Sequence, residues 1–241
     1  MKEELYKMYR RHYFLILASA LIIPICFFIA DFLQSDSLIK SNSGYQTLAE
    51  FCSDMQQNVK YIYYFAVAYI GSDIFAGEVE NGQIKLEILR RGRKTIVKHK
   101  LIAACLFVLI FHAFFWILNG IFWLIEYTSC RFGFADSKLF IHSICSFMGY
   151  YVTFCSMLIL SFLIGCYCKK VITVFATYML WFIVRYVNAV IPMDKVLPEF
   201  VADKYINGIM LVYIRSFAVY ITGMFIIYQI LNIVSRRKDY A

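Results

Sequence analysis

Side chains able to perform catalysis are few and scattered along this chain. The four histidines stand near the ends of apolar runs or singly within them, outside any H-E-x-x-H motif or nucleophile and base pair: His12, His99, His112 and His142. No G-x-x-x-x-G-K-[ST] loop is present to hold nucleotide phosphates. Cys166-Tyr167-Cys168 is one residue short of a C-x-x-C motif. These absences predict a protein that is not an enzyme and has no cofactor or metal of its own.

Acidic and basic residues are concentrated in one segment, GEVENGQIKLEILRRGRKTIVKHK at positions 77–100. Glu78 and Glu80 come early in it, Gly82 is expected to break the chain, and Lys85 precedes a basic cluster that includes Arg93 and Lys100. Acid at the start and base at the end suit the dipole of a helix. The segment is too polar to span a membrane and too short to fold alone, so it needs a partner surface.

The apolar residues of this segment predict how it would meet a partner. Ile84, Ile88 and Leu89 are expected on one face of a short helix. Such a helix could dock into a groove of a soluble protein. The alternative is a loop that only carries the positive charge typical of the cytoplasmic side of a membrane protein.

The composition predicts a membrane environment for the rest of the chain. Of the 241 residues, 61% are hydrophobic and 17% charged, against about 45–50% and 25% in soluble domains. The formal net charge of +8 lies almost entirely outside the apolar runs, which is typical of membrane topology and not of a nucleic-acid groove. We therefore expect a lipid bilayer and no nucleic acid as partners.

The apolar runs predict an all-α integral membrane protein with six transmembrane helices that form a single transmembrane domain over residues 1–241. The expected spans are about 13–33, 59–76, 101–125, 139–168, 171–191 and 209–234. Residues 1–12 are expected to form an interfacial amphipathic helix. The second span is the weakest because it carries Lys60 and Asp73.

The distribution of basic residues predicts the orientation. Sixteen Lys and Arg lie at the two termini, in 77–100 and in the turn at 169–170, against six in the other three loops. By the positive-inside rule both termini are cytoplasmic. Cys52 and Cys130 then fall in external loops, where they could form a disulfide.

Two arginines lie within the expected spans. Arg185 and Arg215 are both expected near the outer side, where Glu126, Asp31 and Asp194 are the natural ion-pair partners. They could form an outer gate or the lining of an exit path. The alternative is a static ion pair or side chains that reach the outer headgroups.

The residues around positions 72–100 carry a resemblance to a known family. Ser72-Asp73-Ile74-Phe75-Ala76-Gly77-Glu78, then Asn81-Gly82-Gln83-Ile84-Lys85, then Arg93 and Lys100, resemble the corresponding segment of type-two ABC transporter permeases, most closely the bacitracin- and lantibiotic-resistance branch. The chain departs from the family pattern at Gln83, where threonine is usual, and lacks the proline common shortly before the arginine.

This resemblance implies a permease subunit of an ATP-binding-cassette exporter in the bacterial cell membrane. The segment 77–100 would be its coupling loop. Asp73 is expected to orient this loop through a basic residue such as Arg93, because it lies at the inner end of the second span. A separate cytoplasmic ATPase would supply ATP and Mg²⁺, and a second permease, identical or related, would complete the path. The substrate would be an antimicrobial peptide, a drug or a lipid-like molecule.

Two other classes of protein remain open. A stand-alone bacteriocin-immunity or accessory membrane protein would share the hydropathy but need no ATPase. A membrane-embedded enzyme would place two or more catalytic polar groups at one depth, and no such set is visible.

Overall fold

A computed structural model of the chain describes residues 2–13, 15–16, 18, 22, 25–26, 48–126, 137–187 and 210–237. Within these ranges the chain is helical apart from short turns. The helices are α1 (Lys2–Arg10), α4 (Leu48–Ser72), the π-helix η1 (Asp73–Gly77), α5 (Glu78–Glu80), α6 (Gln83–Arg91), α7 (Arg93–Glu126), α8 (Ser137–Gly165), α9 (Lys170–Val187) and α11 (Met210–Arg237). The predicted all-α class is confirmed over the described residues.

Several predicted boundaries differ from those in the structure. α4 begins at Leu48, so the expected polar loop before residue 59 was wrong in its last part, and Cys52 is a buried helical residue. α7 begins at Arg93, eight residues before the expected third span. Polar residues continue both helices because propensity and packing extend a helix beyond its apolar core. The expected first span, 13–33, lies mostly outside the described residues.

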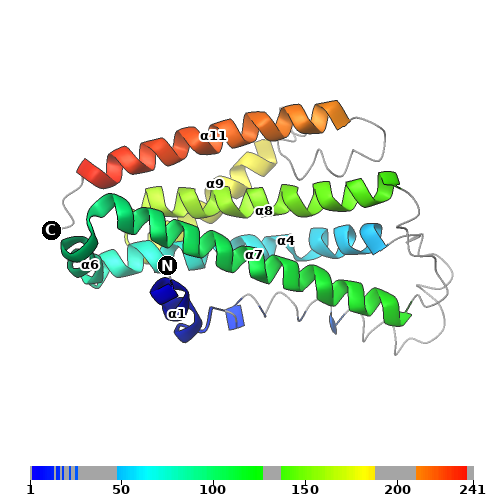
Figure 1. Cartoon of the computed structure of the whole chain (residues 1–241), viewed down its shortest axis with the longest axis horizontal. Coiled ribbons are helices and arrows are strands. Elements are labelled where there is room, and N and C mark those ends of the chain that lie inside the picture. Colours follow the sequence, from blue (N-terminus) through cyan, green and yellow to red (C-terminus); the bar gives the residue numbers. More distant parts are fainter. Residues whose placement is uncertain are drawn as a thin grey trace.

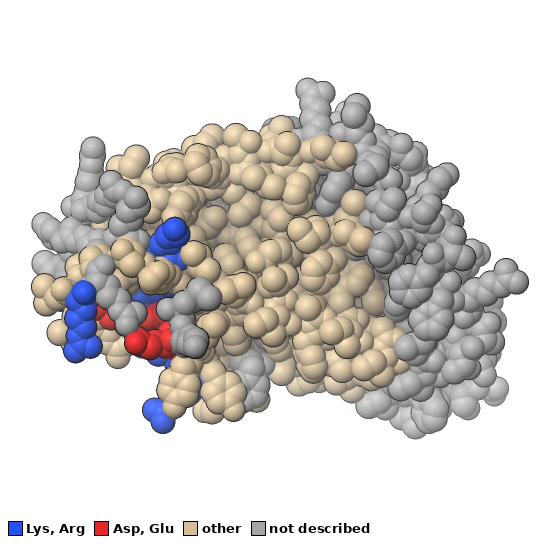
Figure 2. Space-filling model, in the orientation of Figure 1, with Lys and Arg blue, Asp and Glu red and all other residues tan. Residues whose placement is uncertain are grey.

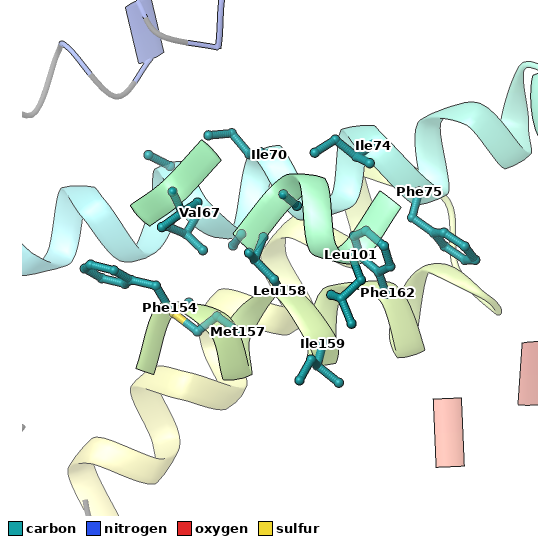
Figure 3. Close-up of a cluster of buried hydrophobic side chains, with 14 of the residues drawn as sticks. Val67, Ile70, Ile74, Phe75, Leu101, Phe154, Met157, Leu158, Ile159 and Phe162 are labelled. Carbon is teal, nitrogen blue, oxygen red and sulfur yellow. The ribbon is translucent and has the colours of Figure 1, made fainter. Parts of the chain in front are cut away.

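The long helices run side by side, and α4 occupies the centre of the bundle against α7, α8 and α9 (Figure 1). Figure 3 shows part of the core that results, where Val67 of α4, Leu101 of α7 and Leu158 of α8 lie in one cluster. The rings of Phe75 in η1 and Phe162 in α8 stack with their centroids 5.0 Å apart. α4 is less apolar than its neighbours, which cover it. The helix with the weakest predicted transmembrane signal therefore packs against three other long helices of the described part of the chain.

Glycine allows α4 and α8 to approach each other closely. A Cβ atom built on Gly71 would lie 2.9 Å from Ser161 Cβ, and one on Gly165 would lie 3.1 Å from Ala76 Cβ. Small residues at helix contacts are typical of membrane bundles, where close packing drives association.

The outer helices expose apolar side chains over much of their length. Large exposed residues include Ile110 and Ile117 of α7, Phe175 of α9, and Phe225 and Ile226 of α11. Among the described residues, three segments are long and apolar enough to cross a membrane, Thr95–Phe122, Ile144–Gly165 and Phe217–Ser235, and the apolar stretch of α9, Lys170–Ile183, is shorter. Apolar surface of this extent indicates a membrane protein.

Candidate functional site

The chain between α4 and α7 folds into a compact helical element at one end of the bundle. η1 ends α4 with a wider turn, and π-turns of this kind often occur at functional sites. Gly82 (φ +68°) then separates α5 from α6, and Gly92 (φ +78°) separates α6 from α7. Positive φ is readily adopted by glycine, which explains both sharp turns. The predicted interruption at Gly82 is confirmed.

Oppositely charged side chains meet where this element packs against α1. We call this set the charged cluster, and it consists of Glu4, Lys7, Arg11, Asp73, Glu78, Glu87, Lys100 and Lys170. On the face drawn in Figure 2, the coloured Lys, Arg, Asp and Glu side chains gather at this end, and the other described residues of that face are tan. Four acids face four bases, so the cluster is electrically balanced. It ties α1, η1, α5, α6, α7 and α9 together.

Lys100 lies at the centre of one half of the cluster. Its side chain is 0% exposed, and its Nζ donates to Glu4 Oε2 at 2.9 Å and to Glu78 Oε2, with Glu87 Oε2 at 3.0 Å. The three carboxylates lie close enough together to hold a metal ion. The lysine ammonium occupies that position and supplies the positive charge instead, since each carboxylate lies within ion-pair distance of it.

Asp73 lies at the centre of the other half. It pairs with Lys170 and with Arg11, whose Nη1 lies 3.5 Å from Asp73 Oδ2, and it accepts a hydrogen bond from the Tyr13 hydroxyl. A Cβ atom on Gly77 would lie 3.1 Å from Asp73 Oδ1, so the glycine leaves room for this carboxylate. Arg11 also joins the two halves, because its Nη2 lies 2.8 Å from Glu78 Oε1.

The two faces of α6 have different surroundings. Ile84 is buried and Ile88 packs against the core, whereas Leu86 is 63% exposed and Leu89 is 83% exposed. The predicted single face of Ile84, Ile88 and Leu89 was therefore wrong. The isoleucines, one turn apart, anchor the helix, while Leu86 and Leu89, three residues apart, share the outer face. This outer face is the apolar surface that α6 offers to a partner.

The remaining predicted residues fall into three groups. Glu80 and Lys85 are exposed on the same element. Glu78, Ile84 and Lys100 are buried inside the chain, so they can position α6 but not contact a partner directly. The side chains of Arg93, Arg185, Arg215 and Glu126, and all of Asp31 and Asp194, lie outside the described residues. The predicted outer ion pairs and the Asp73–Arg93 contact therefore stay predictions.

Five members of the charged cluster were missed by the sequence reasoning: Glu4, Lys7, Arg11, Glu87 and Lys170. A usable signal was present in the N-terminal segment, because positions 4, 7 and 11 share one stripe of a helix. Met8 lies beside this stripe and is buried. The stripe therefore faces the interior of the protein, where charged side chains need oppositely charged partners.

Comparisons with models of protein families, with curated proteins and with solved structures find no match to this chain. The function is therefore argued from the geometry of the charged cluster and of α6.

The charged cluster predicts acid sensitivity through Glu87. Burial by itself raises the pKa of this carboxyl, but hydrogen bonds and attraction from Lys7 and Lys100 outweigh burial and hold the pKa below its ordinary 4.5. A lowered pKa stabilises the fold above the unfolded-state value, and this contribution is lost as the pH falls through the folded-state value. Melting curves should therefore show stability falling below about pH 4.5, with a smaller fall in Glu87→Gln. An equal fall in both proteins would contradict this role of Glu87.

Proposed function

We propose that this chain is the membrane-spanning permease subunit of an ATP-binding-cassette exporter in the bacterial cell membrane. Six spans with both termini in the cytoplasm would form half of the path, and a second permease would form the other half. A separate ATPase would bind ATP and Mg²⁺. The expected substrate is an antimicrobial peptide, a drug or a lipid-like molecule.

One observation carries this proposal: α6 presents Leu86 and Leu89 outward from a helix that is anchored on its other face. An exposed pair of leucines on a short amphipathic helix suits a groove in a soluble partner. The same element is joined directly to α4 through η1 and α5, and to α7 through Gly92. A force applied to α6 therefore reaches two long helices of the bundle.

The charged cluster supports a mechanical role for this connection. Lys100 of α7 is held by Glu78 of α5 and Glu87 of α6, and Asp73 of η1 is held by Lys170 of α9. The Lys100–Glu78 pair is buried and resists separation, because an unpaired charge left in the interior is costly. Closure of the ATPase would then move α6 and the inner ends of α4, α7 and α9 together.

The proposal is tested by recovery of an ATPase with the detergent-solubilised protein from its native membrane. The variant Leu86→Asp with Leu89→Asp places charge in the docking face and should lower recovery at least about tenfold, since a buried leucine contributes roughly 1.5–3 kcal/mol. The matched control is Glu80→Gln with Arg90→Gln, which changes exposed residues of the same element and leaves both leucines. Mass spectrometry should identify an ATPase that carries a G-x-x-x-x-G-K-[ST] loop in the wild type and control samples.

The second candidate is a stand-alone immunity or accessory membrane protein. It would show no ATPase in any sample, including wild type in lipid nanodiscs. Equal recovery of the ATPase by wild type and by the double aspartate variant would instead show that docking occurs elsewhere on the chain.

A further inference from the structure

A cavity lies between α7, α8 and α11, close to the charged cluster but separate from it. Its volume is about 400 Å³, which is within the usual range of ligand pockets. Its walls are mainly apolar, and a lysine lies at one end. The residues that matter here are Lys98, Leu101, Ile102 and Leu106 of α7, Ile159 of α8 and Tyr228 of α11.

The lysine in this cavity differs from its buried neighbour. Lys100 is enclosed by three carboxylates, whereas Lys98 is exposed and has no ion pair or hydrogen bond with any residue that the structure describes. A positive charge beside an apolar cavity complements a molecule with an anionic head and an apolar tail. The cavity therefore favours an anionic amphiphile over a neutral one.

The positions of the lining residues match the depth profile of a lipid. Leu106 is eight residues beyond Lys98, so it lies about 12 Å further along α7. Lys98 lies only five residues, or about 8 Å, from the start of α7 at Arg93, whereas Leu106 lies about 20 Å from that start and Tyr228 about 14 Å from the end of α11 at Arg237. The charged end of the cavity thus lies near the end of the bundle, and the apolar part extends inward along the membrane normal.

We propose that this cavity is a binding site for an anionic phospholipid. The phosphate lies on the Lys98 ammonium, and one acyl chain lies between α7, α8 and α11 along Leu101 and Leu106. Basic pockets between membrane helices bind anionic headgroups by this combination of charge and apolar contact. The inference does not depend on the ATPase, because it concerns lipid bound by the chain alone.

The role of the Lys98 charge in lipid binding is tested with full-length protein purified in detergent. The protein is supplied with phosphatidylglycerol or phosphatidylcholine of identical acyl chains. Native mass spectrometry should show more phosphatidylglycerol than phosphatidylcholine bound to the wild type. Lys98→Gln should lower phosphatidylglycerol binding about fivefold, as expected for one lysine at a lipid surface, and leave phosphatidylcholine unchanged. Lys169→Gln, which removes an exposed lysine from the turn before α9, should leave both unchanged.

The apolar part is tested by filling the cavity. Leu106→Trp should lower the binding of both lipids, whereas Ile110→Trp, one turn further on an exposed face of α7, should not. Unchanged elution and melting temperature would show that each variant is folded. Equal binding of the two lipids by the wild type, or equal losses in Lys98→Gln and Lys169→Gln, would overturn the proposal. Unchanged lipid binding in Leu106→Trp would exclude the cavity as the position of the acyl chain.

Discussion

Replacing Lys100 by methionine should lower the free energy of unfolding by about 3–5 kcal/mol, the usual cost of removing one partner from a buried ion pair. The substitution keeps much of the apolar volume of the side chain and removes the charge. It leaves Glu4, Glu78 and Glu87 facing one another without the ammonium between them. Reversible unfolding of the purified protein in mixed detergent micelles would measure the loss.

The control for this prediction is Lys85→Met, on the exposed part of α6. Its effect should stay within about 0.5 kcal/mol, as for other surface substitutions. Lys100→Arg keeps the charge and should lower the free energy of unfolding by less than Lys100→Met does. This variant remains measurable if the methionine variant fails to fold. Equal stability of Lys100→Met and Lys85→Met would contradict the buried position of Lys100.

Replacing Gly71 by valine should destabilise the protein by about 1–3 kcal/mol, the usual cost of overpacking a core. A Cβ atom at this position would lie 2.9 Å from Ser161 Cβ and 3.2 Å from Leu158 Cδ2, so α4 and α8 must move apart. The centre of the bundle would then lose contacts along both helices. Thermal melting monitored by circular dichroism would measure the change.

Gly223→Val in α11 is the matched control, because no atom lies within 4 Å of a Cβ atom built there. Gly223→Val should destabilise the protein much less than Gly71→Val does, although both replace glycine by valine. Gly71→Ala with Ser161→Gly should recover part of the stability lost by Gly71→Ala alone, since it removes the atom in closest contact. No recovery in the double variant would show that the close approach to Ser161 is not the cause.

The helical class and the starts of three of the long helices could be predicted from the sequence. α8, α9 and α11 begin within two residues of the expected starts at 139, 171 and 209. Long apolar runs carry this information because the cost of exposing each residue to water depends mainly on that residue and its neighbours. The turn at Gly82 was predictable for a similar local reason.

The faces of α6 could not be assigned from the sequence alone. Its amphipathic character was evident, but the choice of inner face required knowing that Lys100 of α7, which is paired with Glu78 of α5, also pairs with Glu87 of α6. Packing selected Ile84 and Ile88 as anchors, and Leu86 and Leu89 remained outside. The same reasoning applies to α4, whose weak hydropathy gave no indication that it occupies the centre of the bundle.

The sequence by itself determined that this protein is helical, that it has apolar helices suited to a membrane, and that most of its charges lie outside the apolar runs. Only the tertiary structure decided that Glu4 and Lys100, 96 residues apart, form an ion pair, and that Lys98, two residues away, has no partner among the described residues. The physical reason is that hydropathy is a property of a segment, whereas the free energy of a buried charge depends on which distant segment is packed against it.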